Sequence, residues 1–289
     1  MDGRIPDPQE LDPAAAMPPA RQRSDGRVRL RAGPARTGGA TRIIDLAESG
    51  PSRLRFPRGP GALEAVLVNT AGGVACGDAF SVALELDPAA DLVLTTTAAE
   101  KIYRSDGPVS RIENRLSLGA GARLAWLPQE TILFDRARVR RRFEADLAAG
   151  AGLLAVEIVA FGRAARGERI TAGLFADAWR VRRAGRLIYA DSIALDGPIS
   201  DLLARPAIGG GGRACATLLD VSDGAEARLE EARVLLAEAA APGIEAAASA
   251  WNGHLVVRAL AGGIGPLRRL AARFLAGYRG LPMPRVWQS

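Results

Sequence analysis

Apolar and polar residues alternate over much of the chain, and one short unit recurs between the alternating segments. The unit reads Leu-x-x-(Gly/Ala)-Ala-x-Leu and begins at Leu86, Leu118 and Leu147, so its copies start 32 and 29 residues apart. Segments with a period of two, typical of β-strands, precede and follow each copy. The small residues suit a tight turn between two strands, and the leucines suit anchoring of that turn in the core. A chance match in an Ala-, Gly- and Leu-rich chain is the alternative, but the strand context recurs with each copy.

Repeats of about 30 residues are typical of stacked coils or hairpins, whose apolar faces are buried only by their neighbours. The pattern changes after the four glycines at 209–212, which predict a flexible joint. Beyond them we expect a strand, two helices, and a hairpin that turns at Asn252-Gly253. The ranges are 214–221, 244–251 and 254–260 for the strands and 225–240 and 266–278 for the helices. The sequence therefore predicts a mainly β fold, in which a β-helix-like body of stacked strands carries a small α+β C-terminal module with two helices.

The same pattern divides the chain into three parts. Residues 1–26 are a predicted flexible leader, because acids and prolines interrupt the segment and exclude the apolar block of a signal peptide. Residues 27–212 are the predicted β-rich scaffold, and residues 213–289 are the predicted α+β module. No apolar run approaches the roughly 18 residues that span a bilayer, and two cysteines are too few for a disulfide framework. We therefore expect a cytoplasmic protein with no membrane partner.

The net charge of +6 raises the possibility of nucleic-acid binding. Lys101 is the only lysine, so nearly all of the basic charge is arginine, whose planar guanidinium suits protein interfaces. Acidic residues are interspersed throughout except at two short arginine clusters, 136–142 and 180–186, which we assign to ordinary surface or to a protein interface. No groove motif with interleaved aromatic residues is present, so we expect no nucleic-acid partner.

Residues suited to catalysis are scarce. The P-loop motif GxxxxGK[ST] is absent, and a Ser-His-Asp or Cys-His mechanism would have to use His254, the only histidine. Because His254 follows the Asn-Gly turn, we predict that it is a solvated turn residue. One histidine and the distant pair Cys76 and Cys215 cannot complete a tetrahedral metal site without carboxylates. The sequence therefore predicts a protein that is not an enzyme and has no tightly bound cofactor.

Carboxylates are the polar groups that remain. Seven lie in or beside predicted strands: Asp78, Glu100, Asp106, Glu130, Asp135, Glu157 and Glu168. Glu157 lies inside the apolar segment LLAVEIVAF, where burial would cost several kcal/mol unless the carboxylate were paired or hydrated. A solvated strand face and a polar interior both remain open for it. An acidic, water-filled interior could pass a hard or borderline cation weakly without holding it.

Five segments in a fixed order carry a family resemblance. They are LVNTAGGVACGD at 67–78, LTTTAAEKIYRS at 94–105, WLPQETILFD at 126–135, FGRAARGE at 161–168 and LPMPRVW at 281–287. Together they resemble the UreD (UreH) family of urease accessory proteins. Any one segment alone would be weak, whereas five in the correct order are specific.

The resemblance implies a non-enzymatic maturation factor, a chaperone with a β-helix-like body. Proteins of this family bind a UreF-type accessory protein, and the pair recruits a UreG-type GTPase. The complex docks on apo-urease, where nickel is delivered to the active site. Ni²⁺ is thus expected as a transient cargo, and an internal channel is the route that the resemblance suggests.

The resemblance extends to individual residues. The candidates for a channel or for partner contacts are Asp78, Glu130, Asp135 and Glu168, at acidic positions of matching motifs, and Glu157, which the strand pattern adds. The other matching positions are Gly72, Gly73, Gly77, Lys101, Tyr103, Arg104, Pro128, Arg285 and Trp287. The chain departs from the family at Asn69-Thr70-Ala71, where many relatives have His-Pro-Pro, and at Cys76, where they usually have Gly. Cys76 is a weak candidate for a metal ligand, and simple packing is the favoured alternative.

Two other classes of function remain open. A β-helical carbohydrate-active enzyme would use a carboxylate pair such as Asp135 and Glu157. It would need an aromatic-lined groove, yet aromatic residues make up only 5% of the chain. A basic RNA-binding protein would bind nucleic acid with a steep dependence on salt.

Overall fold

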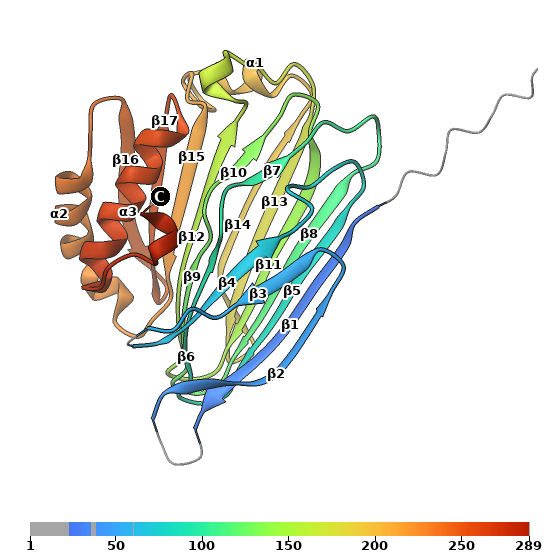
Figure 1. Ribbon diagram of the computed structural model, residues 1–289. Helices are drawn as coiled ribbons and strands as arrows, with labels where there is room; N and C mark the ends of the chain where they lie inside the picture. Colours follow the sequence, from blue (N-terminus) through green and yellow to red (C-terminus); the bar gives the residue numbers. More distant parts are fainter. Residues whose placement is uncertain (1–22, 36–38, 60, 289) are drawn as a thin grey trace, which may run out of the picture.

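Two β-sheets packed face to face make up most of the molecule, with helices on the outer face of one sheet (Figure 1). The computed structural model describes residues 23–35, 39–59 and 61–288, so most of the predicted leader 1–26 lies outside the described residues. The first sheet has the strand order β14-β13-β11-β8-β5-β1-β2. The second has the order β16-β17-β15-β12-β9-β6-β4-β3, with β10 and β7 attached beside β12. The predicted mainly β fold is confirmed.

Strands of the two sheets are interleaved along the chain. The first sheet contains β1 (Asp25–Pro34), β2 (Thr41–Ser49), β5 (Ala79–Leu86), β8 (Ser110–Leu118), β11 (Arg138–Leu147), β13 (Leu174–Arg183) and β14 (Arg186–Asp196). The second contains β3 (Ser52–Arg55), β4 (Leu63–Asn69), β6 (Asp91–Thr96), β7 (Glu100–Ile102), β9 (Arg123–Leu127), β10 (Thr131–Leu133), β12 (Gly152–Phe161), β15 (Ala214–Asp220), β16 (Ile244–Trp251) and β17 (His254–Ala261). The helices are α1 (Ile199–Leu203), α2 (Leu229–Ala239) and α3 (Ile264–Arg279), with 3₁₀ turns η1 (Ala164–Arg166), η2 (Ala225–Arg228) and η3 (Arg285–Trp287).

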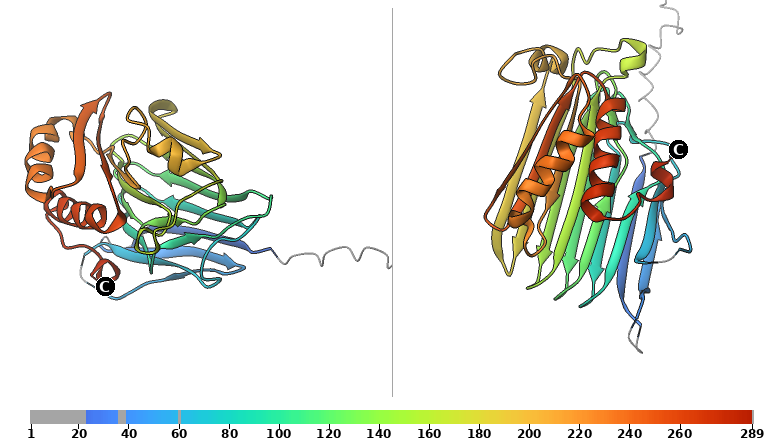
Figure 2. Two further views of the ribbon diagram at one scale, coloured as in Figure 1. Left: turned by 90° about the horizontal axis from the view of Figure 1, so that it is seen from above. Right: turned by 90° about the vertical axis from the view of Figure 1, so that its left-hand side faces the viewer.

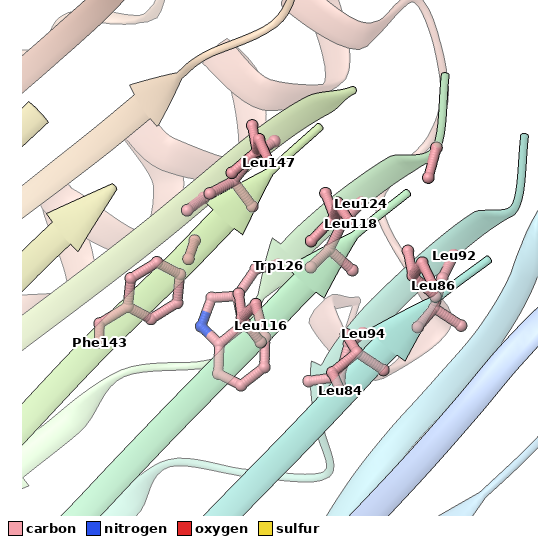
Figure 3. Close-up of a cluster of buried hydrophobic side chains, with 14 of the residues drawn as sticks. Leu84, Leu86, Leu92, Leu94, Leu116, Leu118, Leu124, Trp126, Phe143 and Leu147 are labelled. Atoms are coloured by element: carbon pink, nitrogen blue, oxygen red, sulfur yellow. The ribbon is translucent and has the colours of Figure 1, made fainter. Parts of the chain in front are cut away.

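The recurring leucine unit makes the crossings between the two sheets. Its copies connect β5 to β6, β8 to β9 and β11 to β12. Because these neighbouring strands are parallel within each sheet, equivalent leucines stack in register. They are Leu86, Leu118 and Leu147 in the first sheet and Leu92, Leu124 and Leu153 in the second. Figure 3 shows leucines of both ladders meeting in one buried cluster, so the units build stacked coils, and the alternative of hairpins is wrong for them.

Backbone conformation explains the small residues of the unit. The fourth position is left-handed in every copy, with φ of 61° at Ala89, 68° at Gly121 and 69° at Gly150. Glycine reaches this region without steric cost, and two copies use it. The fifth position is a buried alanine in every copy. A larger side chain there would have to enter the core between the sheets.

Helices α2 and α3 cover the outer side of the second sheet at its C-terminal end (Figure 2). Leu267, Leu270 and Phe274 of α3 are buried in one cluster with Val156 and Ile158 of β12. Both predicted C-terminal helices are therefore present. Strands β15 to β17 continue the second sheet beyond β12. Strands on both sides of the predicted boundary at 212/213 thus share one sheet, and the division into domains stays a prediction.

The predicted C-terminal hairpin is present, but the prediction for His254 is wrong. Asn252 and Gly253 have φ of 51° and 80° and join β16 to β17. His254 already belongs to β17 and is only 1% exposed. Its ring centroid lies 5.0 Å from that of Tyr189 and 4.3 Å from that of Trp251. Burial lowers the pKa of His254 below its ordinary value and so favours the neutral ring.

Candidate functional site

A layer of charged side chains interrupts the apolar interior between the two sheets. One buried cluster includes Phe143, Ala155 and Trp179, and a second includes Val139, Val159 and Phe175. On each of β11, β12 and β13 the two cluster residues are four positions apart and point inward. The residue midway between them therefore also points inward, because side chains of a strand alternate between its two faces. Those three positions are Arg141, Glu157 and Asp177, which we call the charged layer.

Arg141 is the centre of the charged layer and links the two sheets. Its Nη2 donates to Asp177 Oδ2 at 2.7 Å, within the first sheet, and its Nη1 donates to Glu157 Oε1 across the interior. Nη1 also donates to Thr131 Oγ1 at 3.0 Å. The Trp179 Nε1 donates to the same Asp177 oxygen at 3.2 Å. Our assignment of residues 136–142 to the surface is therefore wrong for Arg141, whose side chain is 7% exposed.

Electrostatics of the charged layer follow from its burial. Burial alone would lower the pKa of Arg141, but attraction to Asp177 and Glu157 outweighs it and raises that pKa, so the guanidinium stays charged. Burial raises the pKa of Glu157, and Arg141 opposes this rise. Of the two possibilities left open for Glu157, the polar interior is the one that the structure contains.

Two cavities flank the charged layer inside the stack of coils. The larger, of about 90 Å³, lies between the sheets and is lined by Asn69, Glu100 and Arg141 among others. The smaller, of about 20 Å³, is lined by Asp191 and Cys215 among others. Glu157, Asp177 and Trp179 line both. Since a buried water needs roughly 10–15 Å³ of such volume, each cavity has room for water. The shared lining residues place the two cavities next to each other along the stack of coils, and we call the pair the internal path.

Glu100 is a cavity carboxylate that the sequence places beside a strand but does not single out as a site residue. It lines the larger cavity, and Asn69 Nδ2 donates to its Oε1 at 3.2 Å and to Gly73 O at 3.0 Å. Burial raises the pKa of Glu100 to about 7, and the Asn69 hydrogen bond opposes this rise. Asn69, which stands where many relatives have the His of His-Pro-Pro, is thus hydrogen-bonded to a carboxylate with a pKa near 7.

Glu100→Gln is expected to stabilise the protein above pH 7. The folded-state pKa is raised from 4.5 to about 7, so the wild type loses stability as pH rises through this window. The variant has no such charge, so its advantage should grow from pH 4.5 and level off above pH 7 at about 3 kcal/mol, since one pKa unit is worth about 1.4 kcal/mol. Urea unfolding at several pH values measures it. Glu85→Gln, with a side chain 58% exposed, is the control, and equal pH profiles for both variants would contradict the prediction.

Asp135 and Glu168 lie in loops and bind backbone there. Asp135 Oδ1 accepts from Thr171 N at 2.6 Å. Glu168 accepts from Arg163 Nη2 at 2.7 Å and from Asp135 N at 3.3 Å. The Arg163 guanidinium holds the pKa of Glu168 at about 2. These two candidates therefore brace neighbouring loops, and the lining of the two cavities contains neither of them.

Asp78 and the glycines of the first motif fix another turn. Asp78 is buried, and its two oxygens accept from Ser24 N and Ala75 N, both at 2.8 Å. Gly73 has φ of 152°, and a Cβ there would lie 2.5 Å from the Tyr103 ring. Tyr103 itself donates to Gly72 O at 3.1 Å. This turn requires glycine because of both its conformation and its close packing.

Cys76 packs in the same region as part of a hydrogen-bonded group. Its Sγ donates to Asp106 Oδ1 at 2.8 Å and accepts from Ser105 Oγ at 3.1 Å. Gly77 follows with φ of 78°. Among the described residues, no group of three or more His, Cys, Asp or Glu side chains is placed to hold a metal ion.

The remaining motif positions divide between the surface and the C-terminal end. Lys101, Arg104 and Arg285 are exposed, and Pro128 lines the larger cavity. Glu130 Oε2 lies 3.4 Å from Arg268 Nε of α3. Trp287 is buried, and its Nε1 donates to Thr95 Oγ1 at 3.2 Å and to Leu127 O at 3.1 Å. The motif at 281–287 is thus attached to β6 and β9.

Of the acidic candidates, only Glu157 belongs to the internal path. Of the example pair for a carbohydrate-active enzyme, Glu157 binds Arg141 in the interior, and Asp135 binds Thr171 in a loop. Sequence reasoning missed Asp177 and Arg141. A signal for Arg141 exists, since it falls in phase with Val139 and Phe143 in the alternating pattern of β11.

Comparisons with known proteins agree over nearly the whole chain. The family model described as UreD urease accessory protein matches residues 24–288. Urease accessory protein UreD 1 of Methylobacterium radiotolerans is 79% identical over 98% of this chain and 97% of its own. UreD 2 of Methylorubrum populi is 65% identical over 94% of this chain and 92% of its own. UreD of Xanthobacter autotrophicus is 57% identical over 98% of this chain and 96% of its own. No helix among the described residues has the length and apolar character to cross a membrane.

Proposed function

Because this chain belongs to the UreD family of urease accessory proteins, we propose that it is a non-enzymatic chaperone that assists nickel insertion into urease. In this proposal it acts in the cytoplasm with UreF-type and UreG-type partners and docks on apo-urease. The family match over residues 24–288 is the observation that carries the proposal. Relatives that are named urease accessory proteins, at up to 79% identity, support it.

Oxygen ligands along the internal path support the part of the proposal that concerns nickel. Glu100, Glu157, Asp177 and Asp191 line the two cavities, which follow one another along the axis of the coils. Carboxylates alone are weaker ligands for Ni²⁺ than imidazole or thiolate ligands. A path of this kind suits an ion in transit, which has to be released at its destination.

Activation of urease in cells tests the proposed function. Urease and its other accessory proteins are co-expressed with and without this chain under limiting nickel. We expect the urease made without the chain to lack nickel and to be inactive, whereas the complete set gives active enzyme. Full urease activity and a full nickel content without this chain would refute the proposal.

Asp135→Ala and Glu168→Ala are expected to weaken urease activation without unfolding the protein. Each substitution releases a loop that the carboxylate holds through backbone N–H groups, at a cost of about 1–3 kcal/mol. Activation in the co-expression system and the circular dichroism of the purified variants measure the two effects. Glu245→Ala, at an exposed position of β16, is the control. Normal activation by both loop variants would exclude these carboxylates from the function.

A further inference from the structure

We infer that Arg141 is a gate in the internal path: its guanidinium occupies the two carboxylates that both cavities share, Glu157 and Asp177, and a divalent cation takes its place between them when it moves away. The inference deepens the proposed function, on which it rests only for the choice of nickel as the ion. The position of the guanidinium, its ligands and its surroundings each support it.

Arg141 lies at the carboxylates that the two cavities share. Glu157 and Asp177 line both cavities, whereas Arg141 lines only the larger one. The guanidinium reaches from the first sheet to Glu157 in the second and binds Asp177 beside it. The two carboxylates that both cavities share thus hold a positive charge between them, and electrostatic repulsion opposes the approach of a second cation to either one.

The ligands are the second argument. Two carboxyl side chains and the Thr131 hydroxyl surround one guanidinium, so the group contains two acidic side chains for one basic one. A divalent cation in the same place would balance both carboxylates. Carboxylate and hydroxyl oxygens bind divalent cations, and water from the cavities can complete the coordination. Buried charges are tolerated when they are paired, so an ion that replaces Arg141 maintains the pairing of Glu157 and Asp177.

The surroundings of Arg141 provide somewhere for it to go. The larger cavity lies on its own side of the charged layer and contains further hydrogen-bond acceptors, among them Glu100 and Asn114. Arg141 is 9% exposed, and its buried Nε has no hydrogen-bond partner among the described residues. An unpaired buried donor is unfavourable, so the present position does not satisfy the whole guanidinium. A turn of the side chain into the larger cavity frees Glu157 and Asp177, the carboxylates that both cavities share.

Removal of the arginine tests the gate in the isolated protein. We would titrate NiCl₂ into wild type, Arg141→Met, and the triple variant Arg141→Met/Glu157→Gln/Asp177→Asn, and follow thermal unfolding by circular dichroism. The unfolding temperature of Arg141→Met should rise with Ni²⁺ and saturate at a roughly tenfold lower concentration than any rise in wild type. The triple variant should show no such rise.

The titration separates a gate at Arg141 from an arginine that only stabilises the fold. If Arg141→Met does not fold alone, the inference requires that Ni²⁺ restore its folded spectrum. It is overturned if Ni²⁺ has no effect on Arg141→Met, or if Ni²⁺ stabilises the triple variant equally. Arg142→Met, whose side chain points outward at 57% exposure, should respond to Ni²⁺ as wild type does. The titration contains no urease, so its failure leaves the proposed function standing, and failure of urease activation leaves the gate standing.

Discussion

Arg141→Met is expected to reduce the free energy of unfolding in metal-free buffer by about 3–5 kcal/mol, because it leaves buried carboxylates without their counter-ion. The Glu157 and Asp177 side chains are 17% and 9% exposed, so water compensates them poorly. A domain of this size has a total stability of about 5–15 kcal/mol, and the loss is a large part of it. Urea unfolding at pH 7 with a chelator present measures the change.

The neighbouring arginine provides a matched control. Arg142 has the same chemistry but lies on the outer face of β11, where its guanidinium is 3.9 Å from Glu144. Exposed ion pairs contribute about 0–1 kcal/mol, so Arg142→Met should change stability by less than that. Similar losses for the two variants would show that the charged layer does not depend on Arg141.

The triple variant separates the ion pairs from the packing. When all members of a buried charged cluster become neutral together, no uncompensated charge remains, and the cost is often small or reversed. Arg141→Met/Glu157→Gln/Asp177→Asn should therefore recover most of the stability that Arg141→Met loses. A triple variant as unstable as the single one would mean that the contact of the Arg141 guanidinium with the Phe175 ring, whose centroid lies 4.9 Å from Cζ, carries the effect.

The parts of the fold that the sequence predicts are those that local spacing determines. The leucines and small residues of each unit lie within seven positions, so the turn and its anchors can be read together. The same holds for Asn252-Gly253, whose left-handed conformation is a property of two adjacent residues. The prediction of a solvated turn position fails for His254 because this residue directly follows the turn and is already the first residue of β17, which is buried.

The charged layer depends on register, which the sequence alone does not contain. Arg141 pairs directly with Asp177 only because β11 and β13 align in parallel at that residue. Glu157 approaches the same guanidinium from the other sheet, on a coil that crosses at Leu147 to Leu153. The burial of Glu157 could be suspected from its apolar neighbours, whereas its partner could not be identified. The loop carboxylates were found through motif resemblance, but their backbone partners needed the folded chain.

Trp287→Ala should lower the free energy of unfolding by about 3–5 kcal/mol, the usual cost of deleting a buried large aromatic side chain. The indole is 4% exposed and lies under the Arg268 guanidinium, 5.6 Å from its ring centroid. Its Nε1 donates hydrogen bonds to the Leu127 carbonyl and the Thr95 hydroxyl, which are both buried. Truncation therefore leaves each of these groups with one hydrogen-bond partner fewer. Denaturant unfolding of purified protein measures the change.

A competing outcome is that the segment 281–287, which lies outside the strands, detaches locally at little cost to the rest of the domain. Two further contacts argue against detachment. Gln129 Nε2 donates to Val286 O at 2.9 Å, and the Gln129 Oε1 accepts from Arg268 Nη2 at 3.0 Å, so the tail, α3 and the segment after β9 form one network. Trp251→Ala removes an indole that is 47% exposed and should cost about 1 kcal/mol. If Trp287→Ala cost no more than this control, the C-terminal motif would not serve to hold the second sheet, and a role in partner binding would have to explain it.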